Sequence, residues 1–151
     1  MKKWKFVLLC ILLVALVAAG YYFFNNGLWT YWRLRDDLKN ILNLFAGPIL
    51  FLTAASVLSL IIMIKRKNII LPTLLVFIGV FCKYTIVFID AFYYLTFVSR
   101  PLMIRGGYNI EHLSFDPILI LIDFIFKTAV IILPALIIYG CINIVRYIKN
   151  R

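Results

Sequence analysis

Four ionisable residues interrupt two long apolar stretches of the sequence. Lys83 and Asp90 lie in one stretch, and Asp123 and Lys127 lie in the next. A charge at the centre of a bilayer costs about 2.5–3.5 kcal/mol on insertion scales, so each of these side chains needs an ionic partner, water or a neutral state. Groups of this kind form proton relays, ion paths and pockets for lipid headgroups. They also form ion pairs that join helices, and we expect this structural role ahead of a ligand site.

The spacing of these charges supplies partners. Lys83 and Asp90 are seven residues apart and therefore share one face of a helix. Asp123 and Lys127 are four residues apart with the acid first, which is the favourable order for a helical ion pair.

Counting at 1.5 Å per residue from each end places both Lys83 and Asp123 ~9 Å below the same membrane boundary. Lys127 falls near the midplane by the same count, and Asp90 near the interface. We therefore predict that the third and fourth helices are neighbours, joined by a Lys83–Asp123 contact with Lys127 close by. If Asp90 and Asp123 instead line one cavity, the cluster is a candidate relay or headgroup pocket.

A second candidate site lies in the polar connection 99–116. Its members are Arg100, Arg105, Glu111, His112 and Asp116. His112 is the only histidine and has the chemistry of an acid–base catalyst, with Glu111 and Asp116 available to orient it. A solvated loop is the preferred interpretation.

No motif indicates a metal or a cofactor. The three cysteines, Cys10, Cys82 and Cys141, all lie inside apolar runs and form no C-x-x-C pair. H-E-x-x-H, G-x-S-x-G and the P-loop motif are also missing from the sequence. We expect no metal and no cofactor, and we favour a non-enzymatic role over an enzymatic one.

Hydroxyl residues form a stripe in the second apolar stretch. Thr53, Ser56 and Ser59 follow one another at three-residue spacing. We expect their hydroxyls to bond the backbone one turn earlier or a neighbouring helix.

Composition identifies the solvent of these elements. Of 151 residues, 65% are hydrophobic, well above the roughly 45–50% of soluble domains. Lys and Arg number 16 against six acidic residues, but they gather at the ends of apolar runs. This placement favours anionic lipid as the partner over nucleic acid.

Four runs are long enough to cross a membrane, at about 6–24, 44–64, 69–98 and 117–144. The first follows Lys2, Lys3 and Lys5 and is expected to be an uncleaved helix, because its apolar stretch continues beyond a signal-peptide length. The third is long enough to tilt or project beyond the membrane. Asp116-Pro117 is a helix-start signal, and Pro134 should kink the fourth helix.

The polar segment 25–43 has apolar residues at helical spacing with charged residues on another face. This pattern predicts an amphipathic helix on the membrane surface, with a plain loop as the alternative.

Orientation follows from the basic residues. The two termini and the loop 65–67 together carry nine Lys and Arg, and the two other connections carry five. The positive-inside rule places both termini in the cytoplasm.

Small residues predict where helices approach closely. Ala15 and Ala19 in the first span, and Ala55 and Ser59 in the second, are spaced four apart. Such pairs permit close packing of helix backbones in lipid.

The sequence thus predicts an all-α integral membrane protein, a single domain built as a four-helix antiparallel bundle with an amphipathic interfacial segment. Its plan is similar to that of many small bacterial inner-membrane proteins, but no motif identifies a family. We expect a non-enzymatic accessory or interaction protein that binds a partner protein or lipid, including anionic lipid at the cytoplasmic face. The alternatives are a small oligomeric transporter or channel that uses the intramembrane charges, and a membrane-embedded enzyme acting on lipid. A second copy of the chain is a further possible partner.

Overall fold

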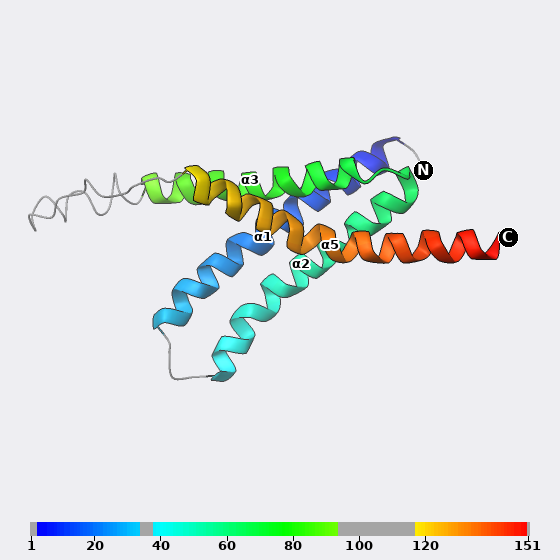
Figure 1. Ribbon diagram of the computed structural model, residues 1–151. Helices are drawn as coiled ribbons and strands as arrows, with labels where there is room; N and C mark the ends of the chain where they lie inside the picture. Colours follow the sequence, from blue (N-terminus) through cyan, green and yellow to red (C-terminus); the bar gives the residue numbers. More distant parts are fainter. Residues whose placement is uncertain (1–2, 34–37, 94–116, 151) are drawn as a thin grey trace, which may run out of the picture.

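The chain forms four long helices. The computed structural model describes residues 3–33, 38–93 and 117–150, with side chains described at 3–25, 27, 44–89 and 117–150. The helices are α1 (Lys3–Arg33), α2 (Leu38–Arg66), α3 (Ile70–Tyr93) and α5 (Pro117–Lys149) (Figure 1). The described ranges contain no strand. The predicted all-α class is confirmed.

Each helix contains a stretch that is long and apolar enough to cross a membrane. These stretches are Lys3–Asn25, Leu44–Arg66, Ile70–Ile89 and Pro117–Lys149. In each of them only 28–33% of the most apolar window is buried inside the chain. The remaining side chains face outward and are mostly Leu, Ile, Val and Phe. Hydrocarbon is the solvent that such a surface fits, so the chain is a multi-pass membrane protein. The part of the predicted third span beyond Tyr93 lies outside the described residues.

The predicted surface segment 25–43 is divided between two helices. Helix α1 continues to Arg33, and α2 already begins at Leu38. A continued helix satisfies the backbone hydrogen bonds of these polar residues without a separate element. Positions 34–37 lie outside the described residues.

The turn between α2 and α3 has a clear local cause. Lys67 adopts a left-handed backbone conformation, with φ of 51°, which ends α2. The Ile70 amide then donates to Oδ1 of Asn68 at 2.8 Å, so Asn68 caps the start of α3. Helix α3 therefore begins at Ile70, one residue after the predicted start of the third span near Ile69.

Two prolines shape α5. The helix begins at Pro117, as the Asp116-Pro117 signal predicts, because proline at the first helical position loses no helical hydrogen bond. Figure 1 shows that α5 changes direction near its middle, and Pro134 lies in the middle of its sequence. An interior proline removes one backbone hydrogen bond, which accounts for the bend.

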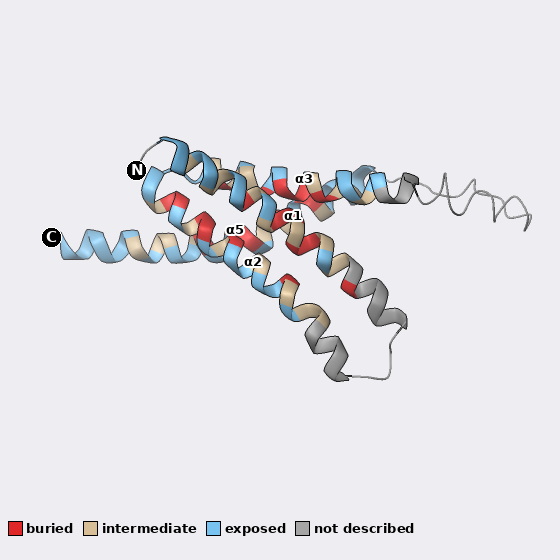
Figure 2. Cartoon of the chain, turned by 180° about the vertical axis from the view of Figure 1, so that it is seen from behind, coloured by how far each residue is buried: buried red, intermediate tan, exposed pale blue. Residues whose placement is uncertain are grey.

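The helices form an up-and-down arrangement in which α1 and α5 are diagonal to each other. Helix α1 packs against α2 and α3, and α5 packs against the same two helices. The predicted proximity of the third and fourth spans is therefore confirmed. Both chain ends lie at the same end of the molecule (Figure 1). At the opposite end, α1 and α2 diverge from α3 and α5 (Figures 1 and 2).

The core lies where the four helices cross, which Figure 2 shows as the buried residues. Its members are Leu13, Val17 and Tyr21 of α1; Ala55, Leu58, Ile62 and Met63 of α2; Val76 and Val80 of α3; and Phe124, Ile131, Ile132 and Ala135 of α5. Lipid is as apolar as these side chains, so close packing rather than water exclusion holds them together.

Glycines set the closest helix contacts. A Cβ atom added to Gly79 of α3 would lie 2.7 Å from Cβ of Val17 and 3.0 Å from the backbone oxygen of Val14, both on α1. A Cβ on Gly20 of α1 would lie 2.8 Å from the Leu52 side chain of α2. These two glycines therefore permit α1 to approach both of its neighbours.

The predicted small-residue pairs are only partly correct. Ala55 and Ser59 are fully buried, as expected. Ala15, however, is exposed, because α1 turns the face of Leu13, Val17 and Gly20 inward instead. The prediction for the first span is therefore wrong at Ala15, while Ala19 is half-buried.

Candidate functional site: a polar network across α1, α3 and α5

The predicted ion pair within α5 is present. Nζ of Lys127 lies 2.5 Å from Oδ2 of Asp123, one helical turn away. The Lys127 side chain is 15% exposed and that of Asp123 is 38% exposed. The pair therefore lies at the edge of the bundle, with its ammonium end turned inward and its carboxylate end accessible.

Lys127 connects this pair to two other helices. Its ammonium donates to the hydroxyl of Tyr84 on α3 at 2.8 Å. It also lies 4.8 Å from the centre of the Tyr84 ring and 5.7 Å from that of Tyr21 on α1. An ammonium over an aromatic face is electrostatically favourable, more so where water is excluded.

Tyr21 reaches α5 across the bundle. Its hydroxyl donates to the backbone oxygen of Lys127 at 2.7 Å, although α1 and α5 are diagonal helices. Because Tyr21 is only 5% exposed, this bond satisfies a buried polar group. The network therefore joins α1, α3 and α5 at one level of the molecule.

Lys83 is the most deeply buried charged residue among the side chains that the structure describes. It is only 2% exposed, and its ammonium lies 4.0 Å from the centre of the Tyr84 ring. Lys127 lies 4.8 Å from the centre of the same ring and binds Asp123, so Lys83 and the ion pair gather around Tyr84. Among the described residues, no carboxylate forms an ion pair with Lys83.

The predicted Lys83–Asp123 contact is therefore corrected. Asp123 bonds Lys127, which projects from the same helix one turn away, and Lys83 packs on the Tyr84 ring instead. The physical reason is that Asp123 lies on the accessible side of α5, whereas Lys83 faces the core. Asp90 lies on α3, but its side chain is outside the described part, so its predicted roles remain predictions.

Tyrosines are the part of this network that sequence reasoning missed. Tyr21 and Tyr84 lie within the predicted spans 6–24 and 69–98, whose hydropathy gives no sign of their roles. The available signal was the phenolic hydroxyl, which normally finds a partner when the ring is buried.

The hydroxyl stripe of α2 behaves as predicted. Thr53 donates to the oxygen of Ile49 and Ser59 to that of Ala55, each one turn earlier. Ser56 donates to the backbone oxygen of Ile131 on α5 at 3.1 Å. That oxygen lies three residues before Pro134, in the turn where proline weakens the helical ladder. Tyr21 and Ser56 thus hold two successive turns of α5 immediately before its bend.

A groove lies beside the network, between α3 and α5. It has a volume of about 510 Å³ and is lined by Phe81, Tyr84, Thr85, Val87 and Phe88 of α3 and by Ile120 and Phe124 of α5. Tyr84 belongs to both features, since its ring lines the groove and its hydroxyl binds Lys127. The groove lies in the half of the bundle that is distant from the chain ends.

The second predicted site lies in the connection 99–116. Arg100, Arg105, Glu111, His112 and Asp116 all lie outside the described residues. Their predicted surface role stays a prediction.

Comparisons with models of known protein families, with curated proteins and with solved structures found no match to this chain. Functional inference therefore depends on the network and the groove themselves.

Proposed function

We propose that this chain is a non-enzymatic protein of the cytoplasmic membrane that acts by binding a membrane lipid in the groove between α3 and α5. The observation that carries the proposal is the groove of about 510 Å³ whose wall residue Tyr84 is hydrogen-bonded to Lys127. An apolar cleft with a few polar groups at its edge is the usual form of a site for an amphiphile.

The polar network has a structural role in this proposal. It holds α3 and α5 together through the bond from Lys127 to Tyr84, and so it fixes the two walls of the groove. The 2% exposure of Lys83 supports a packed ion cluster over a water-filled path. The accessible carboxylate of Asp123 and its partner Lys127 are the groups available to a lipid headgroup.

Lipid retention tests the proposal. Thr85 lines the groove and is exposed, so Thr85→Trp should fill the space. Ile86 is also exposed but is not part of the lining, so Ile86→Trp should not fill it. Native mass spectrometry can count the lipids that remain bound to the protein after delipidation. We expect Thr85→Trp to retain one lipid fewer than the wild-type chain and Ile86→Trp. Equal retention in all three, with equal elution on gel filtration, would exclude this groove as the site.

A further inference from the structure

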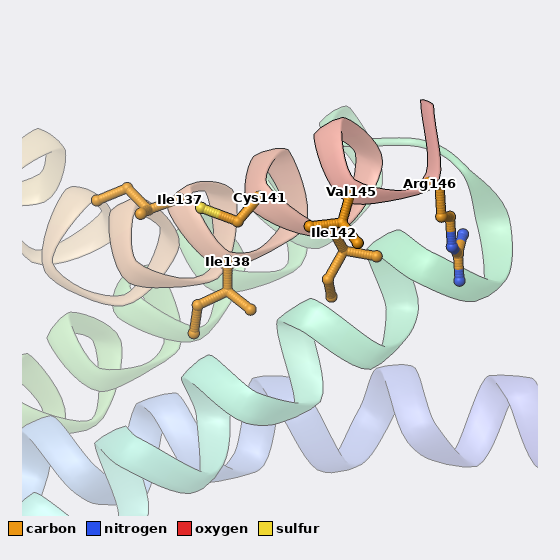
Figure 3. Close-up of a pocket in the computed structure, with 6 residues that line it drawn as sticks. All are labelled: Ile137, Ile138, Cys141, Ile142, Val145 and Arg146. Atoms are coloured by element: carbon orange, nitrogen blue, oxygen red, sulfur yellow. The ribbon is translucent and has the colours of Figure 1, made fainter. Parts of the chain in front are cut away.

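The half of α5 that follows Pro134 carries a second groove. It has a volume of about 460 Å³ and is lined by Ile137, Ile138, Cys141, Ile142, Val145 and Arg146. These residues form two adjacent rows at four-residue spacing, 137–141–145 and 138–142–146, so the groove follows the helix axis. In Figure 3 the side chains of Ile138 and Ile142 point to the side on which α2 lies.

The bend of α5 gives this groove its position. Before Pro134, α5 is held to α2 by the bond from Ser56 to the Ile131 oxygen. After Pro134, α5 diverges from α2, and most of its side chains are exposed (Figures 1 and 2). The two rows of this Ile-rich helix are therefore left largely exposed by the part of the chain that the structure describes, with only Ile142 half-buried.

The groove has one apolar part and one cationic end. Its length from Ile137 to Arg146 is ~14 Å, which matches about half of the ~30 Å hydrocarbon core of a bilayer. Arg146 is the only polar side chain of its lining, and it lies at the end towards the C-terminus (Figure 3). Among the side chains that the structure describes, none forms a hydrogen bond or an ion pair with the Arg146 guanidinium.

The described charges around the end of the molecule that holds Arg146 are basic. This end also holds the start of α1 and the turn Lys65-Arg66-Lys67, and its described residues include seven Lys and Arg. The six acidic residues are at 36, 37, 90, 111, 116 and 123, so none belongs to the segments at this end. Arg66 is already engaged, since its guanidinium lies 3.9 Å from the centre of the Phe6 ring.

From these observations we infer that the α5 groove binds one acyl chain of an anionic phospholipid in the leaflet at the chain ends, with its phosphate on Arg146. Charge complementarity and the one-leaflet length of the groove identify this occupant. A guanidinium presents several donors in a planar fork, which suits a phosphate. The site is separate from the α3–α5 groove in leaflet and in residues, so either site can fail without the other.

The experiment uses the delipidated full-length chain with an equal mixture of phosphatidylglycerol and phosphatidylcholine, and native mass spectrometry counts each bound lipid. We expect a preference for phosphatidylglycerol that Arg146→Gln lowers about fivefold, the effect of one cation near an anionic headgroup. Lys149→Gln removes the same charge one turn away and should change the preference less than twofold.

A second pair of variants tests the apolar part. Ile142→Trp should fill the groove and lower retention of both lipids, while Ile144→Trp, an exposed position outside the lining, should retain them. Equal effects of Arg146→Gln and Lys149→Gln would overturn the inference in favour of a diffuse basic surface. It would also be overturned by a dimer that Ile142→Trp dissociates, because a second copy would then cover the groove.

Discussion

At the scale of single residues, the two buried lysines differ in what surrounds them. Lys127 has a carboxylate, a phenol hydroxyl and two aromatic rings as neighbours. Lys83 has the Tyr84 ring at 4.0 Å. Sequence reasoning predicted the Asp123–Lys127 pair correctly, but it also predicted a contact between Asp123 and Lys83, because spacing along the chain does not show how each helix is rotated.

This difference predicts responses of different size to the same substitution at the two lysines. Lys127→Met leaves the Asp123 carboxylate and the Tyr84 hydroxyl without their partner and should lower the free energy of unfolding by roughly 1–3 kcal/mol. Lys83→Met removes a desolvated charge while keeping a flexible side chain against an aromatic ring, so the change should stay within about 1 kcal/mol. Unfolding by SDS titration in mixed micelles measures both values.

The outcome for Lys83 also bears on Asp90, which shares its helix face. A loss for Lys83→Met as large as that for Lys127→Met would contradict the prediction. It would mean that Lys83 has a strong ionic partner, for which Asp90 is the candidate.

At the scale of the elements, hydropathy located the helices well but could not orient them. Local sequence accounts for the four apolar runs, for the start of α5 at Pro117 and for the bend of α5 near Pro134. The inward face of α1 does not, since apolar residues surround this helix on every side. For this reason the predicted close contact at Ala15 is wrong. Gly20 of α1 and Gly79 of α3 make the close contacts instead.

Glycine substitutions test those contacts. Gly79→Ala places a methyl group 2.7 Å from Cβ of Val17 and should cost about 1–3 kcal/mol of stability through overpacking. Gly20→Ala should cost less, because its nearest atom is the movable end of the Leu52 side chain. The midpoint of thermal unfolding in detergent gives the order.

Gly140 supplies the matched control within a helix. Nothing lies within 4 Å of a Cβ added there, so Gly140→Ala should be neutral or stabilise by about 0.5–1 kcal/mol through helix propensity. If Gly79→Ala and Gly140→Ala shift the midpoint equally, the close approach of α1 and α3 is refuted.

At the scale of the whole molecule, charge is distributed unevenly along the sequence. The two terminal segments and the turn 65–67 carry nine basic residues and no acidic one, while the six acidic residues lie in the two other connections and in the third and fourth spans. This asymmetry was readable from the sequence alone, because the four spans alternate in direction and bring the basic segments together.

The asymmetry predicts the orientation of the protein in a bacterial inner membrane. Alkaline phosphatase fused after position 106 should be active, because the predicted orientation places that connection on the periplasmic side, and green fluorescent protein fused after Arg151 should fluoresce in the cytoplasm. Replacing Lys65, Arg66 and Lys67 by Gln should reduce the bias towards this orientation. Active phosphatase at the C-terminus would contradict the assignment.

Access of water to position 83 tests the central claim, that the charges form a packed tie between helices and not a path through them. The test uses Lys83→Cys in a chain whose three native cysteines are replaced by Ala, with Lys67→Cys in the exposed turn as the control. A membrane-impermeant maleimide, applied to whole cells and to inverted vesicles, should label Lys67→Cys from one side and leave Lys83→Cys unlabelled from both. Labelling of Lys83→Cys at a rate close to that of Lys67→Cys would reveal a water-filled route and contradict the account.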